Sequence, residues 1–190
     1  MAGGNATLRL AIVNADGSGL VELAAAGDHA AFPSWSPDGG QLVYAEMGTG
    51  EQRGLRIIDL ATNAITVLTT EPDNFPSWSP LGDRIAFTRS PLGLAGASQI
   101  HSVKPDGTGL TRLTFHPGVQ DAHPAYSPDG RWIAFTSARI NPRIQPTDFL
   151  SAHHAVGQIF VMRADGSDVR QLTDIEFTNG TPAWMSLPAE

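Results

Sequence analysis

Cysteine is absent from the 190 residues of this chain. Its absence excludes disulfide bonds, thiolate metal sites and a cysteine nucleophile. The chain also lacks any apolar run close to the roughly 18 residues that a membrane-spanning helix requires. The opening segment, MAGGNATLRL, has no basic stretch followed by an apolar core, so we expect no export signal in it.

Basic residues and catalytic motifs are also scarce. Lysine and arginine number 12 against 19 acidic residues, which gives a net charge of −7. Nonspecific binding to nucleic acid is therefore not expected, because it requires a basic face. The motifs G-x-S-x-G, H-E-x-x-H and G-x-x-x-x-G-K-[ST] do not occur. No apolar period of about 3.6 residues is sustained over a long segment, so no long amphipathic helix is predicted. The chain is therefore expected to consist of short strands and turns.

What the chain does contain is one phrase in four copies. The copies are FPSWSPDG from Phe32, FPSWSPLGD from Phe75, HPAYSPDG from His123 and TPAWMSLP from Thr181. A second phrase alternates with it, as IVNADGSGL from Ile12, SVKPDGTGL from Ser102 and VMRADGSDV from Val161, with a degenerate copy, IIDLATNAI, from Ile57. Two phrases in alternation at this spacing indicate tandem copies of one supersecondary unit.

Each complete unit reads as four short strands joined by turns that contain Pro, Asp and Gly. This pattern predicts an all-β fold, a β-propeller of four-stranded antiparallel blades. The predicted strands are 31–35, 41–46, 55–60 and 65–69, then 74–78, 84–89, 99–104 and 110–114, then 122–126, 132–137, 158–163 and 169–173. Aromatic side chains of the first strands are expected to fill the space between blades; they are Trp35, Trp78, Tyr126 and Trp184.

The pairing of PSWSPDG with a following strand, as in Ile85-Ala86-Phe87 and Ile133-Ala134-Phe135, and with an NADGSG turn resembles the TolB-type, WD40-like (PD40) propeller repeat. The resemblance covers the chain from about Leu8 to Trp184. It implies a non-catalytic binding or scaffold module that contacts a protein or peptide, in a periplasmic or other extracytoplasmic location. The family also includes propeller portions of peptidases related to prolyl oligopeptidase, and its propellers commonly have six or more blades.

A single propeller domain is predicted over residues 1–190, with complete blades at 31–70, 74–115 and 122–174. The termini carry pieces of a fourth blade, at 8–30 and 177–190, which supply its third, fourth and first strands but not its second. The ends could close a four-bladed ring within one chain, the chain could be part of a larger propeller, or two chains could join their open ends. Closure within one chain is slightly favoured, because the pieces are complementary. The open forms predict association through unpaired strand edges.

Polar residues precede each inner strand, where a propeller opens its central channel. They are Asp28, His29, Asp73, Asn74, Asp121, His123 and Asn179. We expect them to contact a protein or peptide. Two alternatives stay open: the residues cap turns through hydrogen bonds to backbone amides, or their carboxylates hold Ca²⁺ in the channel. No other cofactor is expected, and the Asp-Gly pairs are interpreted as hairpin turns rather than calcium loops.

The third unit carries an insertion at 138–157, and long loops on a rigid scaffold often carry binding residues. Its candidate contact residues are Arg139, Arg143, His153 and His154. The alternative function is a propeller lyase or hydrolase with a channel-mouth metal, for which His29, His116 and His123 are the candidates, or the propeller portion of a peptidase-related protein. The enzyme question stays open, and the binding module is the preferred interpretation.

Overall fold

The structure is a computed structural model that describes residues 7–48, 53–90, 98–116, 118–139, 157–174 and 179–185. These ranges contain three four-stranded antiparallel sheets, one two-stranded sheet and one short 3₁₀ helix. The predicted all-β fold class is therefore confirmed. Across the described residues, no helix has the length and apolar character that a membrane span requires.

The three complete blades contain every strand that the repeat predicts, with small differences at the ends. The first blade has β3 (Ala30–Trp35), β4 (Gln41–Met47), β5 (Arg53–Asp59) and β6 (Ile65–Val67). The second has β7 (Asp73–Trp78), β8 (Ile85–Arg89), β9 (Gln99–Val103) and β10 (Thr111–Arg112). The third has β11 (Asp121–Tyr126), β12 (Trp132–Ser137), β13 (Gln158–Arg163) and β14 (Arg170–Gln171).

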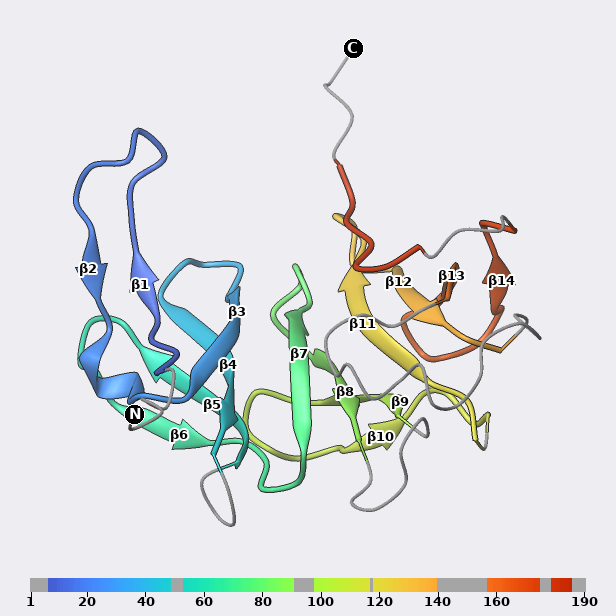
Figure 1. Ribbon diagram of the computed structural model, residues 1–190, viewed down its shortest axis with the longest axis horizontal. Helices are drawn as coiled ribbons and strands as arrows, with labels where there is room; N and C mark the ends of the chain where they lie inside the picture. The colour runs from blue at the N-terminus through green and yellow to red at the C-terminus, as the bar shows by residue number, and fades with distance from the viewer. Residues whose placement is uncertain are drawn as a thin grey trace, which may run out of the picture.

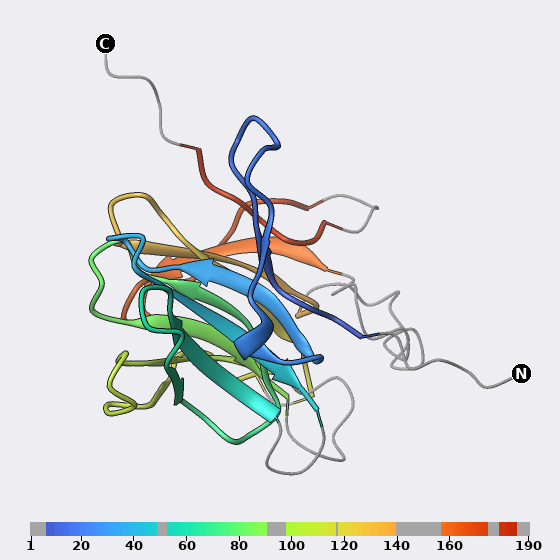
Figure 2. The ribbon, with the colours of Figure 1, turned by 90° about the vertical axis from the view of Figure 1, so that its left-hand side faces the viewer.

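The blades lie side by side as a fan, each turned relative to the one before it (Figure 1, Figure 2). Within each blade the strands are hydrogen-bonded in sequence order, so the connections are simple hairpins. The first strands, β3, β7 and β11, lie on the inner side of the fan, and the fourth strands, β6, β10 and β14, lie on its outer side (Figure 1). We call the inner side the concave side.

Hydrophobic layers join the blades. Between the first and second blades, Val43 and Leu55 form one cluster with Ile85, Phe87 and the indole of Trp78. A second cluster spans the second and third blades. Complete burial of such a side chain stabilises a fold by roughly 1.5–3 kcal/mol, so these layers make the fan one cooperative unit.

The aromatic positions of the inner strands fill the blade junctions only where both blades are complete. Trp78 is 8% exposed. Tyr126 packs partly buried against the cluster of the second and third blades, and burial raises its pKa to about 12. Trp35 and Trp184, at the two ends of the fan, are 51% and 40% exposed. The predicted role is thus seen at the internal junctions, and the end positions lack a complete neighbouring blade.

The second repeated phrase and the run that follows it have a local structural reason. A threonine hydroxyl after the fourth strand of each complete blade accepts a backbone N–H from near the start of the third strand, over 2.9–3.0 Å. The pairs are Leu55–Thr69, Ile100–Thr114 and Ile159–Thr173. In the Asp-Gly turns, Asp16, Asp106 and Asp165 each accept a hydroxyl and a backbone N–H from the residue two positions on. These bonds lower the pKa of each carboxyl group. The contacts are those of hairpin turns, as the sequence analysis expected.

The pieces of the fourth blade lie at opposite ends of the fan (Figure 1). The hairpin of β1 (Ala11–Ile12) and β2 (Val21–Glu22), with the 3₁₀ helix η1 (Ala24–Ala26), packs on the first blade. The segment 179–185 has no assigned strand and lies on the third blade, where the indole of Trp184 donates to the carbonyl oxygen of Ala125 over 2.9 Å. In the described ranges no pairing joins the two pieces, so the closure within one chain that the sequence favoured is not formed.

Candidate functional site

The inner strands share an unusual backbone conformation at the residue before their proline. Phe32, Phe75 and His123 have φ values of 54°, 49° and 55°, and Thr181 in the C-terminal segment has 46°. The pairing register with the second strand of each complete blade shifts around this residue, as in a β-bulge. A left-handed conformation at a residue other than glycine costs of order 1–3 kcal/mol, so the surrounding blades impose it.

The bulged side chains form a continuous row of rings across the three blades. The ring centroids of Phe32 and Phe75 are 4.2 Å apart, and those of Phe75 and His123 are 4.0 Å apart. Phe32 is 36% exposed, Phe75 is half-buried and His123 is buried. We call Phe32, Phe75 and His123 the ring row. It places aromatic surface on three neighbouring inner strands.

Hydroxyl groups fix the spacing of these inner strands. The backbone N–H of Trp78 donates to Ser34 Oγ over 3.0 Å, and that of Tyr126 donates to Ser77 Oγ over 3.1 Å. The N–H of His123 donates to Thr88 Oγ1 over 3.1 Å. Each bond joins the inner strand of one blade to the blade before it. The bonds therefore fix the separation between neighbouring members of the ring row.

Two of the predicted channel-mouth carboxylates are engaged by arginine. The buried Asp73 accepts two hydrogen bonds of 2.7 Å, from Nε and a terminal nitrogen of Arg89. The buried Asp121 accepts one of 2.7 Å from Arg139, whose guanidinium also lies over the ring of Phe160, 4.8 Å from its centroid. Each carboxylate therefore ties the start of an inner strand to a positive charge at the end of the second strand.

The remaining mouth residues lie in three different settings. Asp28 is exposed and pairs with Arg9 over 2.6 Å, and the exposed His29 lies beside it. Asn74 is half-buried, and its Oδ1 has no hydrogen-bond partner in the described ranges. Asn179 donates its backbone N–H to the carbonyl oxygen of Gly157 over 2.8 Å. Of these residues, Asp28 and His29 are exposed to solvent, whereas the Oδ1 atom of Asn74 is buried.

A recess of about 330 Å³ opens beside Asp28 and His29, between η1 and the first blade. Its polar lining comes from Tyr44, Glu46 and Arg56. Burial raises the pKa of Tyr44 to about 12, so its hydroxyl stays protonated at neutral pH. The recess extends the predicted mouth at the N-terminal end of the fan.

Several oxygens of the mouth carboxylates already accept hydrogen bonds within the chain. Calcium takes about six to eight oxygen ligands, whereas both oxygens of Asp73 and one of Asp121 already accept bonds from arginine. In the part of the chain that the structure describes, no three His, Asp or Glu side chains come together in a group that could hold a metal ion. His29, His116 and His123, the histidines predicted for a channel-mouth metal, therefore do not form such a group in the described ranges. Among the candidates of the inserted loop, Arg143, His153 and His154 lie outside the described residues.

Sequence reasoning missed the ring row as a unit. The signal was available, because Phe32, Phe75, His123 and Thr181 hold the same place in the repeated phrase. What the phrase does not reveal is the left-handed backbone, since a residue before proline ordinarily prefers an extended conformation.

Stacked four-stranded blades with bulged inner strands on a concave side define this molecule as an open arc of a β-propeller. The family model described as "TolB beta propeller domain" (PD40) matches residues 2–187. The chain belongs to this family.

Two curated relatives show how far the similarity extends. The chain is 32% identical over 130 residues to "Protein TolB homolog" of Chlorobium luteolum, which covers 68% of this chain and 29% of the relative. It is 34% identical over 144 residues to "Tol-Pal system protein TolB" of Bordetella pertussis, which covers 74% of this chain and 32% of the relative. The chain thus matches about a third of the length of these relatives.

Solved structures agree on the architecture. The crystal structure of TolB from Acinetobacter baumannii aligns with a TM-score of 0.72 at 24% identity, over 92% of this chain and 40% of that one. The structure of a putative TolB from Agrobacterium tumefaciens aligns with a TM-score of 0.72 at 25% identity, over 92% of this chain and 60% of that one. The fan therefore corresponds to an arc of a larger propeller.

Proposed function

We propose that this chain is a non-catalytic binding module that contacts a protein or peptide through its concave side. The observation that supports this function is the ring row, in which stacked rings on three adjacent inner strands end in the exposed ring of Phe32. Aromatic side chains are enriched where proteins bind one another, and strained backbone is often kept at binding sites. Phe32, the most exposed of the three rings, is the proposed anchor.

The polar residues around the ring row take different parts in this proposal. Asp28, His29 and Asn74 form a polar rim that contacts the partner. Asp73 and Asp121 position the inner strands through their arginines. The inserted-loop residues Arg143, His153 and His154 stay proposed contacts.

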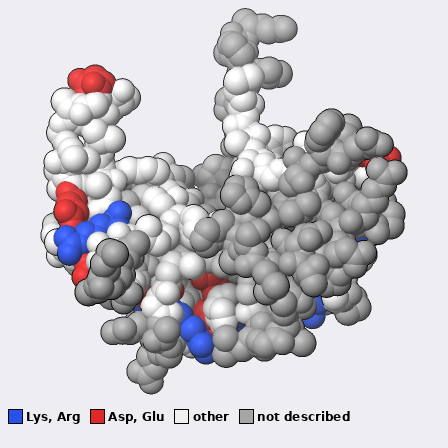
Figure 3. Space-filling view, viewed as in Figure 1, with Lys and Arg blue, Asp and Glu red and all other residues white. Residues whose placement is uncertain are grey.

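The charge distribution favours an apolar anchor over an ionic one. Between the β1–β2 hairpin and the rising C-terminal segment, the described surface is largely without charged side chains (Figure 3). A partner that inserts an apolar side chain would meet this surface without leaving a charge unpaired. The Bordetella relatives are named as Tol-Pal system proteins, so we propose a protein of such a system as the partner and a location outside the cytoplasm.

Titration calorimetry with the purified Pal component of that system tests the proposal. Phe32→Ser removes the anchor, and loss of a central aromatic contact should weaken binding by about 30-fold, the equivalent of about 2 kcal/mol. Phe115→Ser is the control, since Phe115 is 67% exposed and follows the outer strand β10. Equal affinity of Phe32→Ser and the parent chain, with an unchanged circular dichroism spectrum, would contradict the concave-side contact.

A further inference from the structure

One corner of the first blade departs from the plan of the other two. In the second blade the first residue of β7, Asp73, pairs across the sheet with Arg89 at the end of β8 and accepts two hydrogen bonds of 2.7 Å from it. In the first blade the two equivalent residues are Ala30 and Glu46. A methyl group therefore replaces the acid, and a carboxylate replaces the arginine.

An arginine side chain occupies the corresponding corner in both other blades. The guanidinium groups of Arg89 and Arg139 each pair with the buried carboxylate that starts the inner strand. Each also lies over an aromatic ring of the second strand, 5.5 Å and 5.4 Å from the ring centroid. In the first blade the positions of these two arginines hold Glu46 and Gly48, whereas the aromatic position is kept as Tyr44.

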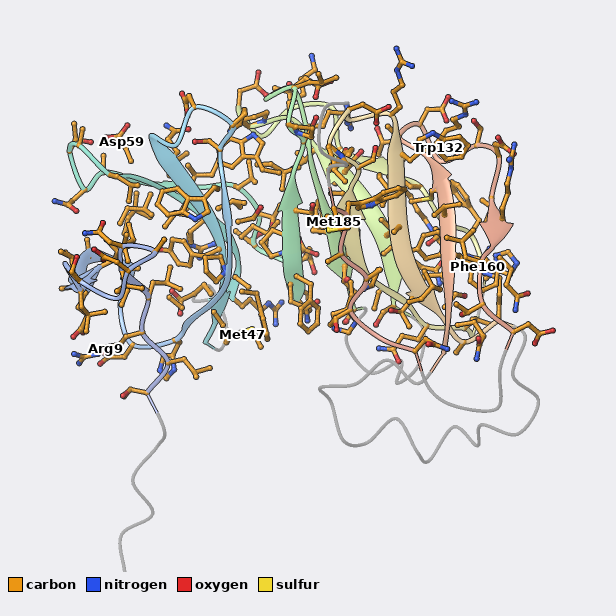
Figure 4. The ribbon with its side chains drawn as sticks, turned by 90° about the horizontal axis from the view of Figure 1, so that it is seen from above. Arg9, Met47, Asp59, Trp132, Phe160 and Met185 are labelled. Atoms are coloured by element: carbon orange, nitrogen blue, oxygen red, sulfur yellow. The ribbon has the colours of Figure 1, made fainter. Side chains whose placement is uncertain are left out.

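The recess of about 330 Å³ beside η1 lies at this corner, on the side of β4 that is seen from above near the labelled Met47 (Figure 4). Its apolar lining comes from Ala25, Ala26 and Ile65, and β4 contributes Tyr44 and Glu46. All of its lining residues fall between positions 25 and 65. The recess is therefore a feature of the first blade and of the linker before it, and it combines an apolar wall with a carboxylate.

Two polar groups of the recess have no partner among the described residues. Tyr44 is 1% exposed, and its hydroxyl makes no hydrogen bond within the described ranges. Glu46 is half-buried and forms no ion pair with a described residue. Polar and charged groups that are shielded from water without a partner are unfavourable, so both would gain from a hydrogen-bond donor that enters the recess.

The other carboxylate and the guanidinium of the lining are already engaged. The exposed Asp28 pairs with Arg9 over 2.6 Å. Arg56 donates to two backbone carbonyl oxygens, over 3.0 Å and 2.8 Å, so its charge is directed at the backbone. Glu46 is therefore the carboxylate of the recess that remains to receive a cation.

We propose that the recess binds an arginine side chain of a partner polypeptide, whose guanidinium pairs with Glu46 and donates to the hydroxyl of Tyr44. Arginine suits the recess because its methylene stem packs on apolar surface while its head stays charged. Its planar fork also pairs with a carboxylate, as Arg89 does with Asp73. The bound side chain would take the place that an arginine holds in the other two blades. The recess is separate from the ring row, so the inference does not depend on the function proposed above.

NMR titration of the 190-residue chain with N-acetyl-arginine amide tests the inference, because this method detects the weak binding expected of a single side chain. The probe should shift the backbone amide signals of Gly27 and Glu46. N-acetyl-citrulline amide, which has a similar shape without the charge, should not. Glu46→Gln should raise the dissociation constant about 10-fold, the effect of losing a charge-assisted hydrogen bond. Glu71→Gln is the matched control, because Glu71 is an exposed acid in the linker of the next junction, and it should leave the constant unchanged.

A double variant fills the recess from within the chain. Ala30→Asp with Glu46→Arg copies the Asp73–Arg89 pair into the first blade, and it should abolish probe binding while the circular dichroism spectrum stays the same. Phe32→Ser, which tests the ring row, should leave the affinity for the probe unchanged. The absence of any shift with the arginine probe, equal binding of the citrulline probe, or full affinity in Glu46→Gln would overturn the proposal. Probe binding that survives in the folded double variant would also overturn it.

Discussion

Replacing Asp73 by asparagine tests whether this carboxylate holds the blade together. Its side chain is fully buried and receives two 2.7 Å hydrogen bonds from Arg89, which is 20% exposed. Breaking a buried ion pair by removing one partner costs about 3–5 kcal/mol. Because Arg89 keeps some contact with water, we expect a loss near the lower limit, about 3 kcal/mol. Asp28→Asn breaks a solvent-exposed pair with Arg9 and should leave stability unchanged.

Urea unfolding followed by tryptophan fluorescence measures this difference as a shift of the midpoint at constant slope. The double variant Asp73→Leu with Arg89→Met provides the second arm. Replacing both partners with apolar residues leaves no unpaired charge, so it should recover most of the loss. If Asp73→Asn kept full stability but lost affinity for the partner, Asp73 would be a contact residue, and the structural role assigned to it here would be wrong.

Three further changes test separate parts of the fold. Gly54→Ala should lower the free energy of unfolding by more than about 2 kcal/mol, because φ of Gly54 is +97° and the new Cβ would clash with the carbonyl oxygen of Thr69. Thermal unfolding should show a smaller loss for Gly17→Ala, because Gly17 also has a positive φ but nothing lies within 4 Å of its new Cβ. Thr114→Val should lower the free energy of unfolding in urea by about 1–3 kcal/mol, since it leaves the N–H of Ile100 unpaired, and an unchanged midpoint would contradict this. Burial lowers the pKa of His101 from 6.5, so its contribution to stability is complete above that pH and is lost as the pH falls toward the lower folded value. Urea midpoints across this range should show the decline in the parent chain and a flatter profile in His101→Gln.

The blades were predictable because their signals are local. Turn residues and alternation located β12 and β13 at the observed residues, 132–137 and 158–163. The fourth strands are shorter than predicted for a physical reason. In the second blade the threonine side chain of Thr114, instead of a backbone group, takes the N–H of Ile100. Ladder pairing therefore ends at Arg112, although the sequence continues with strand-forming residues.

The candidate site was less predictable because its geometry depends on register. Asp73 faces Arg89 only because the strands pair those two residues directly, and a shift of one residue would separate them. In the first blade the same two positions hold Ala30 and Glu46, so the ion pair is absent there. A list of acids before the inner strands could not distinguish carboxylates that face arginine from the exposed Asp28.

The ring row has its origin in the bulge of the inner strands. The left-handed conformation occurs at Phe32, Phe75, His123 and Thr181, which are not all the same residue type, whereas a proline follows each of them. The backbone conformation is therefore a property of the blade, and the side chain placed there is free to serve binding.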